Sequence, residues 1–352
     1  KEVVRSLALM IGYGDNHLGH LTSGGTIANL EALFVAREIH PDKAVAATSN
    51  AHYTHSRMCR VLNCDFIEIP VDPFGVPDLD FIRKHASEIG TIVVTMGTTG
   101  LGFVEPLSDI IDIARDSGIR IHADAAYGGF FKLISDDLPS SSHWSCLSDC
   151  DSVVIDPHKH GLQPYGCGSV LYKDAAVGTY FKHDSPYTYF TSDELHLGEI
   201  SIECSRAGAA AAALWTTLQL LPLTKKGLGS ILSATRKATQ RLAERISNEP
   251  GWQIIAEPQL DILGYFIEPE SKKLSELNHL NRKLFRLGME SRADGFHLSL
   301  FRLGANRFTS IFPDYEPDCS EAVILRSVLM KEEHNSFADE LADRLFTTAQ
   351  NL

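Results

Sequence analysis

The chain has 352 residues, of which 44% are hydrophobic and 22% are charged, enough apolar material for one large core and a second smaller one. Its 45 acidic and 32 basic residues leave a formal net charge of −13. Such a surface repels nucleic acid and anionic membranes, so small molecules or protein partners are the better expectation.

Seven cysteines lie at irregular spacing, without a CxxC pair. An odd number in a chain of this length indicates free thiols and a reducing compartment, so we expect the cytoplasm. The charge-free stretch 207–224 is too weakly hydrophobic to predict a membrane span. The chain begins at Lys1 directly in a helical pattern, so we expect that an N-terminal portion is missing from it.

Between residues 20 and 175, helical patterns alternate with short apolar runs. The runs predict strands at 44–47, 66–69, 91–95, 119–123 and 152–155, and the intervening patterns predict helices at 27–40, 78–89 and 107–117. Short β-rich runs separated by helices are typical of a mostly parallel sheet that is covered on both faces. We therefore expect a doubly wound α/β domain whose ligand lies at the carboxyl ends of the strands.

The pattern changes after residue 203. It predicts helices at 204–221, 228–247, 274–287 and 335–345, and strands at 252–256, 262–267 and 323–330. This is typical of a smaller α+β domain packed against the first. We place the boundary after residue 224, which gives a large domain at 1–224 and a small domain at 225–352.

The segment Thr22–Thr26, with the sequence TSGGT, opens the first predicted helix. Its glycines allow the backbone to approach an anion closely, and the start of the helix offers unpaired N–H groups. A phosphate would fit there, although a helix N-cap with a flexible lead-in has the same composition. The segment is not a P-loop, because the Gly-Lys-Ser/Thr ending is absent.

A carboxylate, Asp124, follows the predicted strand 119–123 and precedes the small residues of the sequence AAYGG. At a strand's carboxyl end it could hold a flat ring. If the ring is a pyridine, the carboxylate keeps the nitrogen protonated and makes the ring an electron sink. The simpler alternative is a loop aspartate that caps a helix.

A lysine, Lys159, follows the strand 152–155 in the sequence DPHKH. Behind the turn fixed by Pro157, its amine is well placed as a nucleophile for an aldehyde, although most lysines are surface charges. His158 and His160 could indicate a metal, but no third ligand stands at a suitable spacing, so we expect none. His52 follows the strand 44–47 and points toward the same sheet edge, although a lone histidine is more often structural.

Taken together, these segments match pyridoxal phosphate. The sequence resembles the group II pyridoxal-phosphate decarboxylases of fold type I, which include the glutamate, aromatic-amino-acid and tyrosine decarboxylases. Residues 19–33 are especially similar to bacterial tyrosine decarboxylases, as is the stretch from 204–208 through Trp215 to 221–223. The resemblance covers nearly the whole chain, and the lysine motif and the DAAYGG motif are highly specific. It implies a fold type I large domain with a mostly parallel mixed sheet.

The resemblance implies three catalytic residues. Lys159 would form the Schiff base with the cofactor, and Asp124 would pair with the pyridine nitrogen. His52 would stack on one face of the ring, and Ala126 would pack against the other face.

It also implies five further cofactor contacts. Gly25, Thr26, Asp156 and His158 would hold the phosphate, and Thr99 would touch the ring. Many relatives carry asparagine in place of Asp156, so the resemblance supports this contact less than the others.

Family members usually carry a further segment before the glycine-rich loop that helps build the dimer and the substrate pocket. We therefore expect a homodimer with the active site at the subunit interface. They also carry a mobile loop with a tyrosine that protonates the substrate carbon. We expect this loop at 178–197, where Tyr180, Tyr187 and Tyr189 are the candidates.

The implied reaction is decarboxylation of an L-amino acid to its amine. Similarity to tyrosine decarboxylases favours an aromatic substrate, while glutamate, aspartate and 2,4-diaminobutyrate remain open. The alternatives are a carbon–carbon lyase of the sphingosine-phosphate lyase type and a cofactor-binding pseudoenzyme. Retention of His52 disfavours an aminotransferase or an aldehyde synthase. Arg206 and Arg326 could meet a substrate carboxylate, although a structural salt bridge is the favoured role for each.

Overall fold

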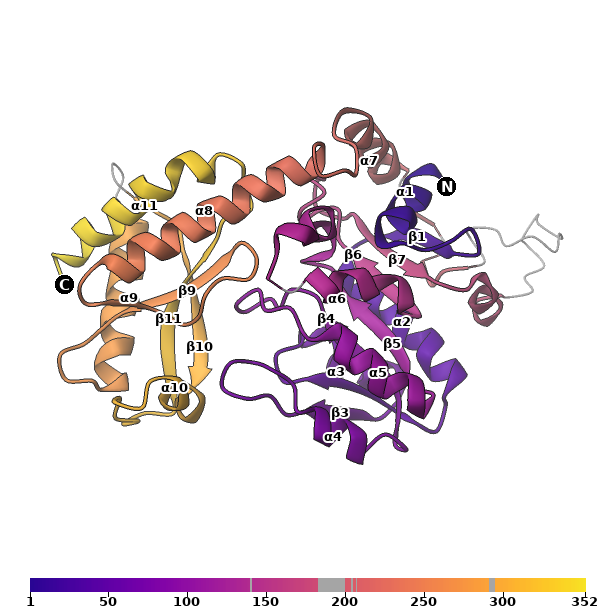
Figure 1. Ribbon diagram of the computed structural model, residues 1–352, viewed down its shortest axis with the longest axis horizontal. Helices are drawn as coiled ribbons and strands as arrows, with labels where there is room; N and C mark the ends of the chain where they lie inside the picture. The colour runs from indigo at the N-terminus through magenta and orange to yellow at the C-terminus, as the bar shows by residue number, and fades with distance from the viewer. Residues whose placement is uncertain (140, 183–199, 204, 207, 291–294) are drawn as a thin grey trace. The chain divides into compact units, whose positions relative to one another are not determined.

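The computed structural model describes residues 1–139, 141–182, 200–203, 205–206, 208–290 and 295–352. The chain divides into two compact units (Figure 1). The first comprises residues 1–71, 77–99 and 104–229, and the second comprises 72–76, 100–103 and 230–352. The sequence predicts a single boundary after residue 224, and it does not predict that two short segments of the first half belong to the second unit.

The first unit is built on a seven-stranded sheet with the order β1-β7-β6-β5-β4-β2-β3. The strands are β1 (Leu18–Thr22), β2 (Ala44–Thr48), β3 (Phe66–Ile69), β4 (Ile89–Thr95), β5 (Arg120–Asp124), β6 (Ser152–Ile155) and β7 (Gly168–Tyr172). Neighbouring strands are parallel from β3 to β6, and β7 runs antiparallel to both β6 and β1. The predicted mostly parallel mixed sheet is confirmed. The strands β1 and β7 are additions, and β1 escapes prediction because Gly19 and His20 interrupt its apolar pattern.

The helices of this unit are α1 (Glu2–Ile11), α2 (Gly25–Ile39), α3 (Thr54–Leu62), α4 (Leu79–Lys84), α5 (Leu107–Ser117), α6 (Ser141–Ser145) and α7 (Ala209–Leu220). Three 3₁₀ helices, η1 (Gly129–Asp137), η2 (Cys146–Asp149) and η3 (Ala175–Tyr180), complete it. The helix predicted at 78–89 is shorter, because α4 stops at Lys84 and β4 already begins at Ile89. Every residue of β2 and β4 is buried, as expected for strands covered on both faces.

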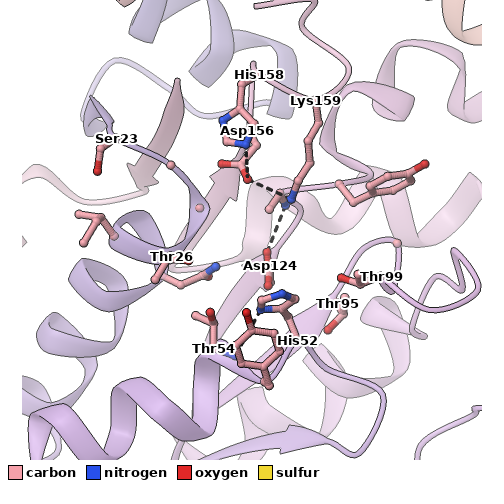
Figure 2. A pocket seen from close by; sticks show the side chains of 18 of the residues that line it. Ser23, Thr26, His52, Thr54, Thr95, Thr99, Asp124, Asp156, His158 and Lys159 are labelled. Carbon is pink, nitrogen blue, oxygen red and sulfur yellow. Dashed lines mark hydrogen bonds and ion pairs between the residues drawn. The ribbon is translucent and has the colours of Figure 1, made fainter. Parts of the chain in front are cut away.

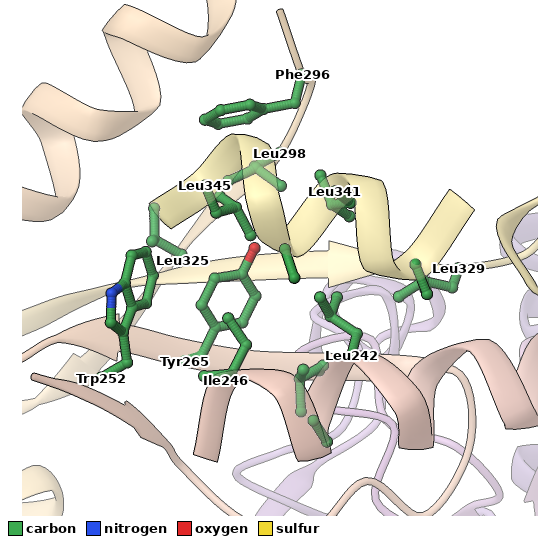
Figure 3. Close-up of a cluster of buried hydrophobic side chains, with 14 of the residues drawn as sticks. Leu242, Ile246, Trp252, Tyr265, Phe296, Leu298, Leu325, Leu329, Leu341 and Leu345 are labelled. Carbon is green, nitrogen blue, oxygen red and sulfur yellow. The ribbon is translucent and has the colours of Figure 1, made fainter. Parts of the chain in front are cut away.

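The second unit holds an antiparallel sheet with the order β10-β11-β9-β8. Its strands are β8 (Trp252–Ile254), β9 (Ile262–Ile267), β10 (Ser299–Gly304) and β11 (Glu321–Val328), and its helices are α8 (Leu228–Asn248), α9 (Leu274–Glu290), α10 (Ala305–Ile311) and α11 (His334–Ala349). Leu242 of α8 and Leu345 of α11 pack against Tyr265 and Leu325 of the sheet (Figure 3). The Tyr265 hydroxyl bonds to Ser327 Oγ at 2.9 Å, so the phenol of this buried tyrosine is paired.

No helix within the described residues is both long and apolar enough to cross a membrane. The feature that positions the site lies in the first unit, where β2, β4, β5 and β6 run in the same direction. Their carboxyl ends therefore meet at one edge of the sheet, which is where ligands of open α/β sheets bind.

Candidate functional site

A cavity of about 380 Å³ opens at this edge of the sheet. The loops after β2, β4, β5 and β6 line it together with the start of α2 (Figure 2). The structure brings all nine residues implied for the cofactor into its wall: Gly25, Thr26, His52, Thr99, Asp124, Ala126, Asp156, His158 and Lys159. Segments more than 130 residues apart in the sequence thus converge on one site.

The start of α2 forms an anion cradle. Gly24 has a φ of 154°, a conformation that residues with side chains rarely adopt. A Cβ on Gly25 would lie 2.5 Å from Asp156 Oδ2, so only glycine leaves this space open. No acceptor for the backbone N–H groups of Gly25 or Thr26 is found among the described residues. Unpaired donors at the positive end of a 15-residue helix are a ready site for phosphate.

Asp124 is held as a carboxylate at the end of β5. His55 Nε2 donates to Asp124 Oδ2 at 2.8 Å, and the Ala126 N–H donates to Oδ1 at 3.2 Å. Burial by itself raises the pKa of Asp124, but the hydrogen bond from His55 and the positive charge of Lys159 outweigh it, and the pKa falls well below its usual value. Asp124 therefore stays ionised and can pair with a protonated ring nitrogen.

Lys159 extends into the cavity from the turn after β6. Its Nζ lies 3.0 Å from Asp156 Oδ2, and Figure 2 shows the same amine pointing toward Asp124. His158 Nε2 lies 3.7 Å from Asp156 Oδ2, and His158 Nδ1 bonds to the Cys167 carbonyl at 2.8 Å. The Lys159 side chain is 33% exposed, so an aldehyde entering the cavity can reach its amine.

His52 lies at the start of the turn that leads into α3. Its ring stacks on Tyr53 with centroids 4.2 Å apart, and its Nδ1 accepts the Thr54 N–H at 3.3 Å. Burial lowers the pKa of His52 from its usual value, with Asp124 opposing the change. A neutral imidazole that lines the cavity is suited to stacking on an aromatic ring.

A second histidine, His122, lies near the ring of His55, with centroids 6.3 Å apart. His122 stands two residues before Asp124 on β5, so both side chains are on the same face of the sheet. Its Nε2 contacts Asn29 Oδ1 and its Nδ1 contacts Ser152 Oγ, both at 2.8 Å. Burial lowers the pKa of His122 to about 3, so it remains neutral. Since Asn29 Oδ1 can only accept, Nε2 carries the proton.

A buried carboxyl group, Glu105, joins the ends of β2 and β4. It accepts the Thr95 N–H at 2.7 Å and the hydroxyl of Thr48, and its own N–H donates to the Thr95 carbonyl at 3.1 Å. These two strand ends lead into the loops that carry His52 and Thr99. Glu105 thereby fixes the starting points of two loops of the cavity.

Sequence reasoning did not assign a role to His55 or Glu105. His55 stands three residues after His52, and only the helical turn of α3 brings it to Asp124. The signal that could have found it is the local cluster of two histidines. The sequence around Glu105 carries no such signal. A glutamate between apolar residues has the same local pattern whether it is buried or lies on a surface loop.

The other candidates do not line the cavity. Arg206 donates to the Leu21 carbonyl and to Ser201 Oγ. Arg326 donates to the Gly100 carbonyl at 2.6 Å. Neither arginine is part of the described cavity wall.

Tyr180 ends η3, whereas Tyr187 and Tyr189 lie outside the described residues. The role predicted for the segment 178–197 therefore stays a prediction. Among the described residues, no group of three or more His, Cys, Asp and Glu side chains could hold a metal.

The cavity fits pyridoxal phosphate on its own geometry. It offers unpaired helix N–H groups for a phosphate, an ionised carboxylate for a protonated ring nitrogen and an accessible amine for an aldehyde. The buried Oδ1 of Asp156 has no hydrogen-bond partner among the described residues, which leaves one more polar atom for a ligand.

Comparisons with known proteins also point to pyridoxal phosphate as the cofactor. The model of the pyridoxal-dependent decarboxylase conserved domain matches residues 3–267. A probable L-tyrosine/L-aspartate decarboxylase of Methanococcus maripaludis is 27% identical over 286 residues, 78% of this chain and 71% of the relative. An L-2,4-diaminobutyrate decarboxylase of Acinetobacter baumannii is 26% identical over 322 residues, 80% of this chain and 62% of the relative.

The crystal structure of Oryza sativa TDC with PLP and tryptamine shares the fold. It matches with a TM-score of 0.83 at 16% identity, over 99% of this chain and 75% of that chain. The family model covers well over half of the present chain. The chain therefore belongs to the pyridoxal-dependent decarboxylase family, and it is an amino-acid decarboxylase that uses pyridoxal phosphate.

Proposed function

We propose that the substrate is an aromatic L-amino acid of the tyrosine type, which the enzyme converts to its amine and CO2. The carrying observation is the aromatic wall of the cavity. Tyr53 and Tyr165 both line it and are 61% and 92% exposed. The Tyr53 ring contacts His52 and the guanidinium of Arg57, and the Tyr165 ring contacts His158, so a substrate ring would meet the part of each ring that stays exposed. Lys159 is the only lysine or arginine among the described lining residues, and the proposed role of its amine is to bind the cofactor. Among the described lining residues, a substrate with an acidic side chain would therefore meet no second lysine or arginine.

Each catalytic side chain has a defined task in this proposal. When bound, pyridoxal phosphate accepts the electron pair that is released as CO2 departs. Lys159 would bind the aldehyde carbon covalently through Nζ and yield that position to the substrate amine. Asp124 would hold a proton on the ring nitrogen, since His55 and the Ala126 N–H keep it ionised.

The remaining residues would hold and orient the cofactor. Gly25 and Thr26 would bind its phosphate through their backbone N–H groups, together with Asp156 and His158. His52 would stack on one face of the ring and Ala126 would cover the other. Thr99 would contact the ring from the loop after β4.

Replacing Lys159 by alanine tests the assignment of the nucleophile. We expect no turnover and no cofactor label on the protein after reduction with borohydride, because only this amine can reach the aldehyde in the cavity. The exposed Lys226→Ala is the matched control, and it should be labelled and active. Normal turnover by Lys159→Ala would contradict the proposal.

A panel of amino acids tests the substrate. CO2 release and amine formation would be measured with tyrosine, phenylalanine, tryptophan, aspartate, glutamate and 2,4-diaminobutyrate. We expect kcat/KM to be highest for an aromatic member. A preference for aspartate would overturn the aromatic assignment. An inactive panel with fully bound cofactor would favour a pseudoenzyme, and aldehyde release from a phosphorylated amino alcohol would favour a carbon–carbon lyase.

The proposed assembly is a homodimer with the active site at the subunit interface. Supporting it, α7 leaves Trp215 43% and Leu220 78% exposed, on a charge-free helix. Large exposed apolar side chains of this kind are typical of a contact surface. Sedimentation velocity over a concentration series should give twice the monomer mass, and Leu220→Glu should shift the protein toward monomer. A monomer at all concentrations would refute the dimer.

A further inference from the structure

The carboxyl group of Asp156 occupies an unusual place for an acid that is expected to hold a phosphate. It is 2% exposed and lies against Gly25, at the first turn of α2. Its Oδ2 faces Lys159, and its Oδ1 is buried without a hydrogen-bond partner among the described residues. The cofactor's phosphate would therefore arrive beside a buried group that can itself be an anion.

Four titratable groups surround this carboxyl. Lys159 supplies positive charge at 3.0 Å from Oδ2, and the His158 ring of the same turn lies 3.7 Å from that atom. Asp124 on β5 adds negative charge, and Cys167, just before β7, is near enough for Asp156 to raise the pKa of its thiol. Burial raises the pKa of Asp156 above its usual value, and Lys159 and His158 oppose that change without cancelling it.

Cofactor binding changes this balance in one direction. A phosphate monoester carries close to two negative charges at neutral pH, about −1.5 to −2. The amine of Lys159, the nearest cation, is the group that the proposed function commits to the cofactor's aldehyde. The carboxyl of Asp156 thus gains the phosphate as an anionic neighbour, and it loses the amine of Lys159 as its counter-ion. Both changes favour the protonated form of Asp156.

We infer that Asp156 binds the phosphate as a neutral carboxylic acid, so that one proton is taken up from solvent when the cofactor binds. The inference rests on the proposed placement of the phosphate at Gly25 and Thr26. Protonation turns the group from an acceptor only into a donor, and its O–H can bond to a phosphate oxygen. Cofactor affinity is then coupled to pH through a single residue.

Proton uptake can be counted directly. Pyridoxal phosphate would be titrated calorimetrically into cofactor-free wild type and Asp156→Asn, in PIPES and in triethanolamine at the same near-neutral pH. Neither buffer has a primary amine that reacts with the aldehyde, and their different ionisation heats report the protons exchanged. We expect wild type to take up about one proton more per cofactor than the variant. The dissociation constant of wild type should also rise by up to about tenfold per pH unit relative to the variant.

Pyridoxal, which lacks the phosphate, is the control ligand. It engages the same lysine without adding the charge of the phosphate, so the difference in proton uptake between wild type and Asp156→Asn should be clearly smaller with pyridoxal than with pyridoxal phosphate. Infrared difference spectra of wild type, with and without pyridoxal phosphate, give a measurement that needs no variant. They should show the carbonyl band of a protonated carboxyl appearing on binding.

The outcomes separate the inference from the proposed function. Equal proton uptake by wild type and variant with pyridoxal phosphate, or no carboxylic acid band, overturns the inference while the lysine label and turnover stand. A difference of the same size with pyridoxal also overturns it, because the proton would not follow the phosphate. Failure of borohydride to label Lys159 would instead refute the proposed function on which the inference rests.

Discussion

Replacing Glu105 by glutamine should stabilise the folded protein relative to wild type, and this gain should be larger near pH 7 than near pH 4.5. Glu105 is fully buried between the ends of β2 and β4, where it accepts bonds from Thr95 and Thr48. Burial raises its pKa from 4.5 to about 7, and the two hydrogen bonds oppose that change only in part. Ionised Glu105 therefore destabilises the folded state relative to the unfolded state, whereas protonated Glu105 does not.

The magnitude follows from linkage. Between pH 4.5 and 7 the folded state holds a proton on Glu105 that the unfolded state has lost. The free energy of unfolding therefore falls as pH rises through this window. The difference between 4.5 and 7 is about 2.5 pKa units, and at 1.36 kcal/mol per unit it is worth about 3 kcal/mol. Glutamine has a similar shape and does not titrate, so Glu105→Gln should escape this loss.

The assay is the thermal unfolding midpoint of the cofactor-free protein, followed across this pH window for wild type and Glu105→Gln. At about 1–2 °C per kcal/mol for a chain of 352 residues, we expect the difference between their midpoints to change by roughly 3–6 °C from pH 4.5 to pH 7. The exposed Glu68→Gln is the matched control and should show a constant difference. Parallel curves for wild type and Glu105→Gln would refute the reasoning, because Glu105 would then have the same proton affinity in both states.

Three further changes test other parts of the structure. His55→Gln removes a hydrogen bond to a charged group, which is worth about 1.5–3 kcal/mol. Cofactor affinity, measured by absorbance titration, should therefore fall at least tenfold. An unchanged affinity would show that Asp124 does not need this hydrogen bond. Gly25→Ala places a Cβ 2.5 Å from Asp156 Oδ2 and should weaken cofactor binding while circular dichroism stays unchanged; tight binding would mean that the cradle can widen. Leu325→Ala creates a cavity in the core of the second unit. The free energy of unfolding of this unit, measured in urea, should fall by about 2–5 kcal/mol. A loss below about 1 kcal/mol would contradict the packing in Figure 3.

Local sequence patterns were sufficient for the parallel part of the sheet and for the cofactor motifs. The runs at 44–47, 66–69 and 152–155 coincide with β2, β3 and β6, because short apolar runs bounded by polar residues are typical of buried strands. The lysine motif follows β6, and the glycine-rich loop opens the helix that the sequence predicts after it. Their meeting at one sheet edge could be predicted, because parallel strands present their carboxyl ends together.

Other elements depended on partners that are distant in the sequence. The strands β1 and β7 pair with each other, and α10 follows β10 in a part of the chain where no strand was predicted. The helix predicted at 78–89 was too long, because residues 85–88 form a turn and β4 already begins at Ile89. Local propensity is a weak guide where tertiary pairing decides the conformation.

The sequence by itself therefore determined which residues could hold pyridoxal phosphate and in what order they occur. Only the tertiary structure decided their charge states. The fold buries Asp124 with two donors and keeps it ionised, but it buries Asp156 and Glu105 in surroundings that raise their pKa values. The three carboxyl groups differ because proton affinity depends on burial and on neighbours that the fold brings from distant parts of the chain.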